Sequence, residues 1–572
     1  MSIFNLEEKG SSFIGEVQAV DTSNIVVKVD NEDALSNIQV NNLVIIQASK
    51  TRQTLIGMVN KIIRTYNEIN EESESQVDYV ASSNDIVKIN MIGTLLDKDG
   101  LQENVFKRTL ESVPEISSEV YIMNDENLSA FMSVISSTST DGNNPLNIGT
   151  YALNKHANAY LDGNKFFQKH AVIVGSTGSG KSCTVATIIQ QIATLKSANA
   201  ILFDIHGEYA PIVGDNIKHY KIAGPTDSYE EGILFLPYWL LTYEEMLAML
   251  LDRGDNNAPN QAMLFSRTVI SEKKSFLLEN NHAELADNIT IDSPIPYSMK
   301  AILDEFDRFN TEMVPGANNK PKKGDYNGLL SRFIQRLENK VSDKRLNFMF
   351  CKDENLLRYE YIDLLFKKLM LSASNGGGIK IIDFSEVPSD ILPLIVSLIA
   401  RLIFTVQQWV EKENIQPIAL FCDEAHLYIP QDVKDGVESL SLNSFERIAK
   451  EGRKYGVGLV VITQRPSEVD RTVLSQSSNF VAMRLTNSDD QSVIKKLLPD
   501  SIGNFGDILP ILDVGEALIV GDASLLPSRI IIRRPSPEPN SSTVKFWNEW
   551  AKENTNASTV SIAVDNMIKQ SK

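Results

Sequence analysis

Length, composition and charge limit the classes to which this chain can belong. Its 572 residues and 63.7 kDa exceed a single hydrophobic core, so we expect two to four structural units. Hydrophobic residues make up 42% of the chain and charged residues 23%, and no apolar run approaches the roughly 20 residues that span a bilayer. The N-terminus lacks the basic start and apolar stretch of a secretory signal, so we expect a cytoplasmic protein without a membrane segment.

The net charge and the cysteines exclude further classes. A formal net charge of −19 argues against a protein that coats nucleic acid with its outer surface, although a narrow channel lined by a few basic loops stays compatible with it. Cys183, Cys351 and Cys422 lie too far apart in the sequence for a disulfide framework or a CxxC metal site. The six histidines show no metal-ligand spacing, so we expect no zinc.

Short apolar runs separated by turn residues fill the N-terminal region from about residue 13 to residue 96. The clearest runs are residues 25–29, 43–46 and 86–89. This spacing predicts a small β-barrel or sandwich within residues 1–130, and the alternative is a β-rich decoration with no role of its own. The segment 67–83 is rich in Glu, Ser and Asn and is predicted to be a loop between strands.

A different pattern begins at Ala171, where an apolar strand is followed by a glycine-rich turn and a helix. Such runs predict a mostly parallel sheet covered by helices. We therefore expect an α/β, RecA-like P-loop core in two parts, residues 131–224 and 371–535. The later apolar runs of this core are residues 200–204, 379–383, 418–423 and 458–463.

Helical periodicity replaces the strand pattern between residues 225 and 370. Residues 242–245, Thr-Tyr-Glu-Glu, have capping-box spacing and open an apolar helix face. We therefore expect a helical insertion in the α/β core. The basic run 320–323 is a candidate DNA contact, and a solvated loop is the alternative.

The C-terminal segment, residues 536–572, is predicted to be a linker and tail. Several prolines between residues 535 and 539 prevent continuation of a strand or helix. Beyond them, Trp547 and Trp550 are expected to pack against another surface.

The glycine-rich turn fits the Walker A pattern, because it lies between an apolar strand and a helix. Its glycines let backbone N–H groups face phosphates, and the helix N-terminus adds partial positive charge. Lys181 is predicted to bridge the β- and γ-phosphates of ATP, and the Ser182 hydroxyl to coordinate Mg²⁺. The predicted nucleotide-binding residues are Gly175, Ser176, Thr177, Gly178, Ser179, Gly180, Lys181, Ser182 and Cys183.

Asp423 and Glu424 follow an apolar strand, as a Walker B pair should. Asp423 is predicted to hold the Mg²⁺ shell and Glu424 to orient or deprotonate the attacking water. An Asp-Glu pair at a strand end can also be a helix cap, but the P-loop favours the catalytic role. The next strand ends at Gln464, a candidate γ-phosphate sensor, for which a satisfied strand-end amide is the alternative.

A predicted helix from Phe445 to Gly456 carries more arginines than capping needs, with Gly456 placed as its C-terminal stop. An arginine finger neutralises charge in the transition state and can raise the rate about 10³- to 10⁵-fold. Because the sequence contains one P-loop core, a finger at Arg453 or Arg447 would come from a neighbouring subunit. Surface ion pairs are the alternative for each arginine.

The segment Asp204-Ile205-His206-Gly207-Glu208-Tyr209 directly follows the second predicted strand of the core. Its acidic and imidazole groups should therefore lie at the same edge of the sheet as the P-loop. There they would tune or position the nucleotide.

Taken together, these motifs resemble the HerA family of hexameric DNA translocases, relatives of FtsK. The resemblance covers residues 150–535, and the strands that precede it look like the small barrel found before the ATPase in that family. The motifs that carry it are GSTGSGKS at Gly175, DIHGEY at Asp204, PYWLLTYEE at Pro237, DEAH at Asp423, EGRKYG at Glu451 and VITQRPSEVD at Val461.

The resemblance implies an ATP- and Mg²⁺-dependent homohexameric ring that threads double-stranded DNA through its pore. It also implies an effector, a nuclease or a sirtuin-like NADase, docked on the N-terminal barrel in phage defence or DNA end processing. The family arginine that acts in trans corresponds to Arg453, with Arg447 as the second candidate, and Lys169 could take the place of a basic residue before the P-loop strand. The family's Walker residues correspond to Lys181, Ser182, Asp423 and Glu424.

Two other functions stay open. An ATP-binding hexameric scaffold could assemble and activate an effector without productive translocation, and the acidic composition is compatible with it. A conjugation or secretion coupling ATPase is the second, although the missing transmembrane segment weighs against it. A two-core RNA helicase shares the DEAH letters, but only about 150 residues follow Glu424, too few for a second core after the first is complete.

Overall fold

The computed structural model divides the chain into two compact units. The first comprises residues 1–192, 463–467 and 475–538, and the second comprises 193–462, 468–474 and 539–572. These units cut across the five segments predicted from the sequence. The structure describes residues 3–4, 12–29, 35–36, 38–48, 50, 52–70, 79–100, 102–139, 145–152, 155–252, 254–315, 321–433, 436–498, 500–541, 544–552 and 557–569.

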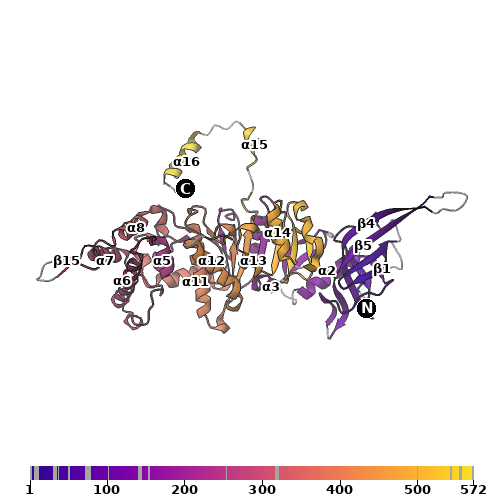
Figure 1. Ribbon diagram of the computed structural model, residues 1–572, viewed down its shortest axis with the longest axis horizontal. Helices are drawn as coiled ribbons and strands as arrows, with labels where there is room; N and C mark the ends of the chain where they lie inside the picture. Colours follow the sequence, from indigo (N-terminus) through magenta and orange to yellow (C-terminus); the bar gives the residue numbers. More distant parts are fainter. Residues whose placement is uncertain are drawn as a thin grey trace. The chain divides into compact units, whose positions relative to one another are not determined.

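A closed β-barrel forms the N-terminal part of the first unit (Figure 1). Its strands are β1 (Phe13–Asp21), β2 (Asn24–Val29), β3 (Leu43–Gln47), β4 (Gln53–Asn70), β5 (Tyr79–Asp99), β6 (Gln102–Lys107) and β7 (Glu119–Ile122). In the order β2-β1-β7-β3-β4-β5 each strand pairs with the next, and β5 pairs back with β2. The pairing closes a barrel, from which β6 extends beside β5, and confirms the predicted small barrel.

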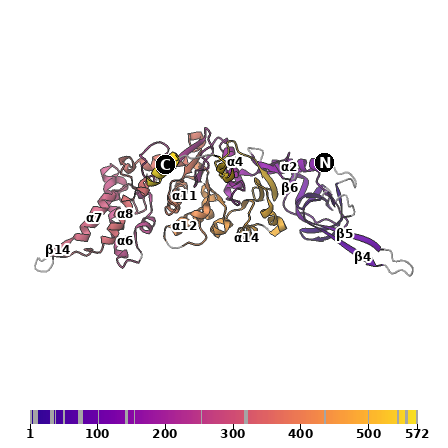
Figure 2. The same cartoon turned by 90° about the horizontal axis from the view of Figure 1, so that it is seen from above.

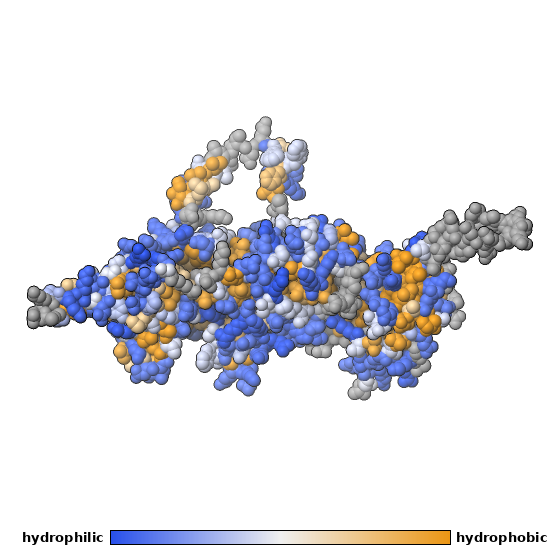
Figure 3. Space-filling view, in the orientation of Figure 1, coloured by the Kyte–Doolittle hydropathy of each residue, from blue (hydrophilic) through white to orange (hydrophobic). Residues whose placement is uncertain are grey.

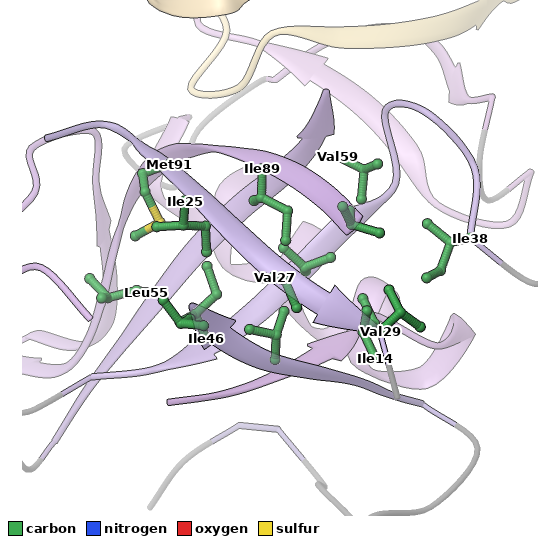
Figure 4. Packing of buried hydrophobic residues seen from close by; sticks show 14 residues of the cluster. Ile14, Ile25, Val27, Val29, Ile38, Ile46, Leu55, Val59, Ile89 and Met91 are labelled. Carbon is green, nitrogen blue, oxygen red and sulfur yellow. The ribbon is translucent and has the colours of Figure 1, made fainter. Parts of the chain in front are cut away.

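Alternate residues of the barrel strands point inward and form its core. In β2, Ile25, Val27 and Val29 are buried, whereas the residues between them are more exposed. Figure 4 shows these side chains together with Ile46 of β3 and Ile89 of β5 in one cluster. Branched aliphatic side chains on every second position therefore fill the interior, as small barrels require.

β4 and β5 extend beyond the barrel as a two-stranded hairpin (Figure 1). Their pairing continues to Asn70 and Tyr79, so the predicted loop over residues 67–83 is wrong in its length. Only residues 71–78 of that segment lie outside the described residues. Its polar composition indicated exposure, but backbone N–H and C=O groups pair across a hairpin whatever the side chains are.

Arg108, just after β6, attaches the barrel to the core of the first unit. Its Nε donates a 3.1 Å hydrogen bond to the carbonyl of Leu525, and its guanidinium also contacts the carbonyls of Gly521 and Ser524. Asp522 lies in the same loop and forms a 2.5 Å ion pair with Lys169. Lys169, the residue proposed to match the family's basic position, is thus held by a carboxylate of its own unit.

The core of the first unit is a mixed sheet with the order β10-β19-β20-β21-β8-β9. β10 and β19 are parallel, and the remaining neighbours are antiparallel. Of these strands, only β10 was predicted. The strands are β8 (Leu146–Tyr151), β9 (Asn158–Leu161), β10 (Ala171–Val174), β19 (Asn479–Met483), β20 (Glu516–Gly521) and β21 (Ser528–Ile532). The helical elements of this unit are α2 (Asp125–Ser139), α3 (Gly163–Gln168), α4 (Lys181–Ile192), α14 (Ser488–Leu497) and η11 (Asp500–Ile511).

The core of the second unit is a parallel sheet with the order β13-β12-β16-β11-β17-β18, which confirms the predicted parallel arrangement. β18 ends at Thr463, the residue at which the chain enters the first unit. The strands are β11 (Ala200–Asp204), β12 (Ile217–Ile222), β13 (Ile233–Leu234), β16 (Ile379–Asp383), β17 (Ile418–Cys422) and β18 (Val457–Thr463).

Helix α11 (Leu392–Trp409) is more apolar than the sequence analysis allowed. Its length and composition alone would suit a membrane crossing, which corrects the expectation that no run approaches that length. However, 72% of the helix is buried inside the protein, and it packs against α12 (Val437–Glu451). Its hydrophobic residues therefore belong to the core of the second unit.

A helical insertion lies between β13 and β16, as predicted. Figure 2 shows α6, α7 and α8 side by side, and the rings of Phe306 and Phe333 stack at 5.2 Å between α7 and α8. Two short strands, β14 (Met313–Pro315) and β15 (Pro321–Lys323), also pair here; β15 is exposed, and Lys320 of the basic run lies outside the described residues. The helices are α5 (Tyr243–Leu250), α6 (Ala258–Glu279), α7 (Met299–Thr311), α8 (Ser331–Ser342), α9 (Asn347–Phe350) and α10 (Tyr361–Met370).

The C-terminal tail carries two helices with exposed apolar side chains, α15 (Phe546–Trp550) and α16 (Ala557–Lys569) (Figure 3). Trp547 is 82% exposed and Trp550 71%, so the expected packing of these rings is not found within the described chain. The ring of Trp550 lies 5.6 Å from that of Phe546 in the same short helix.

A buried ion pair joins the insertion to the core of the second unit. The predicted capping box is confirmed, because Thr242 and Glu245 bond to each other's backbone N–H at the start of α5. Glu245 also accepts two 2.8 Å hydrogen bonds from the guanidinium of Arg401 on α11. The guanidinium of Arg401 also donates to the carbonyl of Leu240, which precedes α5. One side chain of α11 therefore holds both Glu245 within α5 and the backbone that leads into that helix.

We expect Arg401→Met to destabilise the protein by about 3–5 kcal/mol, because it leaves the buried Glu245 carboxylate without its cation. The measurement is urea denaturation followed by circular dichroism. Lys367→Met, which removes an exposed ion pair with Asp363, is the control and should leave the midpoint unchanged. Equal midpoints for the two variants would contradict a structural role for the buried pair.

Candidate nucleotide-binding site

The glycine-rich loop joins the fully buried strand β10 to helix α4 in the first unit. Gly178 and Gly180 have φ values of +73° and +111°, a region that favours glycine. A Cβ atom added to Gly175 would lie 2.4 Å from Ser179 Oγ and 2.8 Å from Met483 Cβ. The loop therefore needs glycine at these positions to hold its shape.

The loop presents hydrogen-bond donors that lack acceptors. Within the described chain, the backbone N–H groups of Thr177, Gly178 and Gly180 donate to no acceptor. Lys181 is 9% exposed, and its Nζ donates to the carbonyls of Gly175 at 2.8 Å and Ser176 at 3.4 Å. Free N–H groups, a lysine and a helix N-terminus together suit phosphate oxygens. These residues thus fit the phosphates of ATP.

Segments distant in sequence support the loop within the first unit. The backbone N–H of Ser176 donates to the carbonyl of Arg484 at 2.8 Å, and that of Gly515 donates to the carbonyl of Ser179 at 2.9 Å. The Thr177 hydroxyl donates to Gln464 Oε1 at 2.6 Å. The structure therefore brings the predicted sensor Gln464 to the loop, while its role as a sensor stays a prediction. Sequence analysis missed Arg484 and Gly515, because only strand pairing brings them here.

Carboxylates occupy the carboxyl ends of three neighbouring parallel strands in the second unit. Asp204 ends β11, Asp383 ends β16, and Asp423 follows β17. Asp204 and Asp383 are direct partners in the strand register, and Phe203 pairs with Cys422, the residue before Asp423. Sequence analysis did not assign Asp383 to the site. The available signal was that three buried strands each lead to an aspartate.

Burial and nearby negative charge make Asp204 and Asp423 hard to ionise. Burial raises the pKa of Asp423 well above its usual range, and the nearby charges of Glu424, Asp204 and Glu208 raise it further. Burial also raises the pKa of Asp204 to about 6, although the N–H groups of Tyr209 and Glu208 donate to its carboxylate. A cation placed among these groups would relieve the repulsion.

Ser182 and Asp423 each carry an oxygen of the kind that Mg²⁺ binds. Among the described residues, no group of three or more His, Cys, Asp and Glu side chains could hold a metal ion. Mg²⁺ needs only one or two protein oxygens when phosphates and water complete its shell. Ser182, at the start of α4 in the first unit, and Asp423, in the second unit, carry the oxygens predicted for it.

The two arginine candidates differ in their surroundings. The guanidinium of Arg447 donates to Gln408 Oε1 at 3.3 Å and lies 5.3 Å from the ring centre of Phe404. Arg453 lies in the 3₁₀ turn η9 (Gly452–Tyr455), is exposed, and has no hydrogen bond or ion pair with the part of the chain that the structure describes. The predicted stop at Gly456 is confirmed by its φ of +70°. Arg453 is thus the arginine that its own chain leaves available.

A phosphate-binding loop after a buried strand, together with acidic residues at the ends of parallel strands, defines a P-loop ATPase. A family model described as the central domain of helicase HerA matches residues 146–403, and one described as HerA-like C-terminal matches residues 385–568. Together the two HerA models match well over half of the chain. This chain therefore belongs to the HerA family.

Curated relatives and solved structures resemble the chain over most of the same region. A probable helicase of Methanocaldococcus jannaschii is 25% identical over 406 residues, which are 68% of this chain and 66% of the relative. The DNA double-strand break repair helicase HerA of Sulfolobus acidocaldarius is 26% identical over 67% of this chain and 68% of its own length. The bacterial conjugative coupling protein TrwB covers 74% of this chain and 94% of its own, with 12% identity and a TM-score of 0.43. The chain thus spans about two thirds of the length of the two relatives.

We expect Gly175→Ala to weaken ATP binding about tenfold or more, because displacing the loop by a steric clash costs at least roughly 1.4 kcal/mol. Titration with a fluorescent ATP analogue in the presence of Mg²⁺ measures the effect. Gly163→Ala is the matched control, since a Cβ added there meets nothing within 4 Å. Unchanged affinity in Gly175→Ala would show that nucleotide does not bind at this loop.

Proposed function

We propose that this chain forms a homohexameric, ATP-driven motor that moves double-stranded DNA through a central pore. The observation that carries the proposal is the P-loop with its unmatched donors and buried Lys181, in a chain of the HerA family. The Sulfolobus acidocaldarius relative is named as a DNA double-strand break repair helicase, which supports DNA as the substrate.

In this proposal each catalytic residue has one task. Lys181 and the free N–H groups of the loop hold the phosphates, and Ser182 and Asp423 hold Mg²⁺. Bound Mg²⁺·ATP supplies the phosphoryl group and the positive charge that the crowded carboxylates lack. Glu424 accepts a proton from the attacking water, and Gln464 contacts the γ-phosphate. Loss of any of these groups should slow hydrolysis.

The exposed position of Arg453 supports an assembly in which neighbouring subunits complete each other's sites. Its guanidinium has no partner among the described residues, although a charged side chain usually finds one when it has a structural role. Arg447, by contrast, is engaged with Gln408 and Phe404 of its own chain. We therefore assign the trans-acting finger to Arg453 and keep Arg447 as the reserve candidate.

The N-terminal barrel is proposed to dock an effector protein, a nuclease or a sirtuin-like NADase, in the cytoplasm. Its core is complete without another protein, so its outer face and the β4–β5 hairpin are available for a partner. Arg108 would transmit a load between that partner and the ATPase core, because it bonds three carbonyls of one core loop. Phage defence and DNA end processing are the proposed settings.

A second candidate function is an ATP-dependent scaffold that assembles the effector without productive translocation. The net charge of −19 favours it, since a DNA-handling protein usually concentrates positive charge. The two functions differ in whether DNA stimulates ATP hydrolysis by the chain alone.

We expect duplex DNA to stimulate ATP hydrolysis by the wild-type chain, since a motor couples its cycle to its track. Glu424→Gln should lower kcat by about 10²- to 10⁴-fold while retaining ATP binding, because it removes the proton acceptor but keeps the shape. Lys181→Ala should lose binding as well. Phosphate release with and without DNA is the measurement. ATP turnover that DNA never changes would support the scaffold instead.

We expect Arg453→Ala and Lys181→Ala subunits, each inactive alone, to regain activity when mixed. An active site needs an intact P-loop in one subunit and an intact Arg453 in the next. In hexamers assembled at random from an equal mixture of the two variants, about a quarter of the sites meet both conditions, so about a quarter of wild-type turnover should return. Arg447→Ala, on α12 just before the turn η9 that carries Arg453, is the matched control and should keep most activity. A mixture as inactive as its parents would place the arginine in its own subunit or exclude it.

A further inference from the structure

His426 contacts the carboxylate that is proposed to activate water. Its Nδ1 lies 3.3 Å from Glu424 Oε2, and the two side chains are only 11% and 10% exposed. A polar contact that is shielded from water is stronger than the same contact at the surface. The contact between His426 and Glu424 is therefore shielded from solvent, and His426 has no role in the mechanism proposed above.

The backbone around Glu424 is held in an uncommon conformation. Glu424 has φ and ψ of +45° and +45°, which for a residue other than glycine costs about 1–3 kcal/mol. A 3₁₀ turn, η8 (Ala425–Leu427), follows, and the N–H of Leu427 donates to the carbonyl of Glu424 at 2.9 Å. The chain thus turns sharply at the end of β17, and this turn brings the ring of His426 to the carboxylate of Glu424.

Buried contacts anchor this turn on both sides. The hydroxyl of the fully buried Tyr428 donates to the carbonyl of Asp423 at 2.8 Å. Ser441 Oγ on α12 lies within hydrogen-bond distance of the carbonyl of Tyr428, at 3.0 Å, and of Pro393 on α11, at 3.1 Å. Tyr428 therefore links the turn to Ser441 of α12 through its carbonyl and back to Asp423 through its hydroxyl, so the turn that carries His426 is held at both of its ends.

The neighbourhood explains why Glu424 needs such support. Asp423 is adjacent, and Asp204 and Glu208 contribute further negative charge at this end of the strands. Electrostatic repulsion from these acidic side chains would push the carboxylate of Glu424 away from them. His426, whose Nδ1 lies 3.3 Å from Oε2, brings a ring nitrogen rather than another carboxylate to Glu424.

We propose that His426 is a positioning residue, which holds Oε2 of Glu424 so that Oε1 is directed at the attacking water. This inference rests on the proposed ATPase function and deepens it. His426 itself touches neither nucleotide nor water in this scheme. It acts through Glu424, so its loss should affect turnover and leave nucleotide binding intact.

The experiment compares His426→Ala, His426→Asn and His426→Gln in the full-length protein. We expect Ala to lower kcat by about 10- to 100-fold with KM for ATP changed less than about twofold, because the base is misplaced but the P-loop is untouched. Asn should recover much of kcat, since its amide nitrogen branches from Cγ as Nδ1 does, whereas Gln extends one bond further and should not. His156→Ala, at an exposed histidine, is the control.

A double-mutant cycle separates positioning from a general structural defect. If His426 acts only through Glu424, then adding His426→Ala to Glu424→Gln should cause no further loss of residual turnover. Thermal unfolding and hexamer mass should match the wild type in the Asn variant, which carries the test if the Ala variant fails to fold.

The proposal and the ATPase function fail in different ways. No ATP turnover by the wild-type chain overturns both. Wild-type turnover with an unchanged kcat in His426→Ala overturns the positioning role alone. The same conclusion follows if KM rises as much as kcat falls, or if Gln restores activity as well as Asn does.

Discussion

Concentrated charge of opposite sign is the constraint on which the functional part of this structure depends. In the first unit, backbone N–H groups and Lys181 gather positive charge at the start of α4. In the second unit, burial raises the pKa of Asp204 and of Asp423, and the nearby charge of Asp204 raises the pKa of Asp423 further. Each arrangement costs folding free energy, which an anion would offset in the first unit and a cation in the second.

The rest of the molecule holds these groups without taking part in the chemistry. The Arg401–Glu245 pair fixes the helical insertion to α11, and Arg108 fixes the barrel to a loop of the first unit. Tyr428 and Ser441 fix the turn that carries Glu424. In each case a buried or partly buried polar group forms hydrogen bonds with backbone or side-chain atoms of another segment. These hydrogen bonds restrict the connection to one geometry.

Three polar side chains illustrate how their surroundings assign roles that residue type leaves open. Arg447 and Arg453 lie six positions apart in one exposed region, yet only Arg447 has partners within the described chain. His426 is one of six histidines with no metal-binding pattern, yet its ring contacts Glu424, the carboxylate proposed to activate water. The burial of these side chains and their distances to neighbouring groups distinguish their roles, whereas their residue types do not.

The sequence by itself determined the features that are local in the chain: the P-loop between β10 and α4, the capping box at Thr242 and the stop at Gly456. Each depends on residues within a few positions, whose conformational preferences act without distant partners. The tertiary structure alone decided that Asp383 joins Asp204, that β4 and β5 pair past residue 67, and that Gln464 reaches Thr177. Those contacts depend on the register between segments that are far apart in the sequence. The residue pattern of each segment alone does not specify that register.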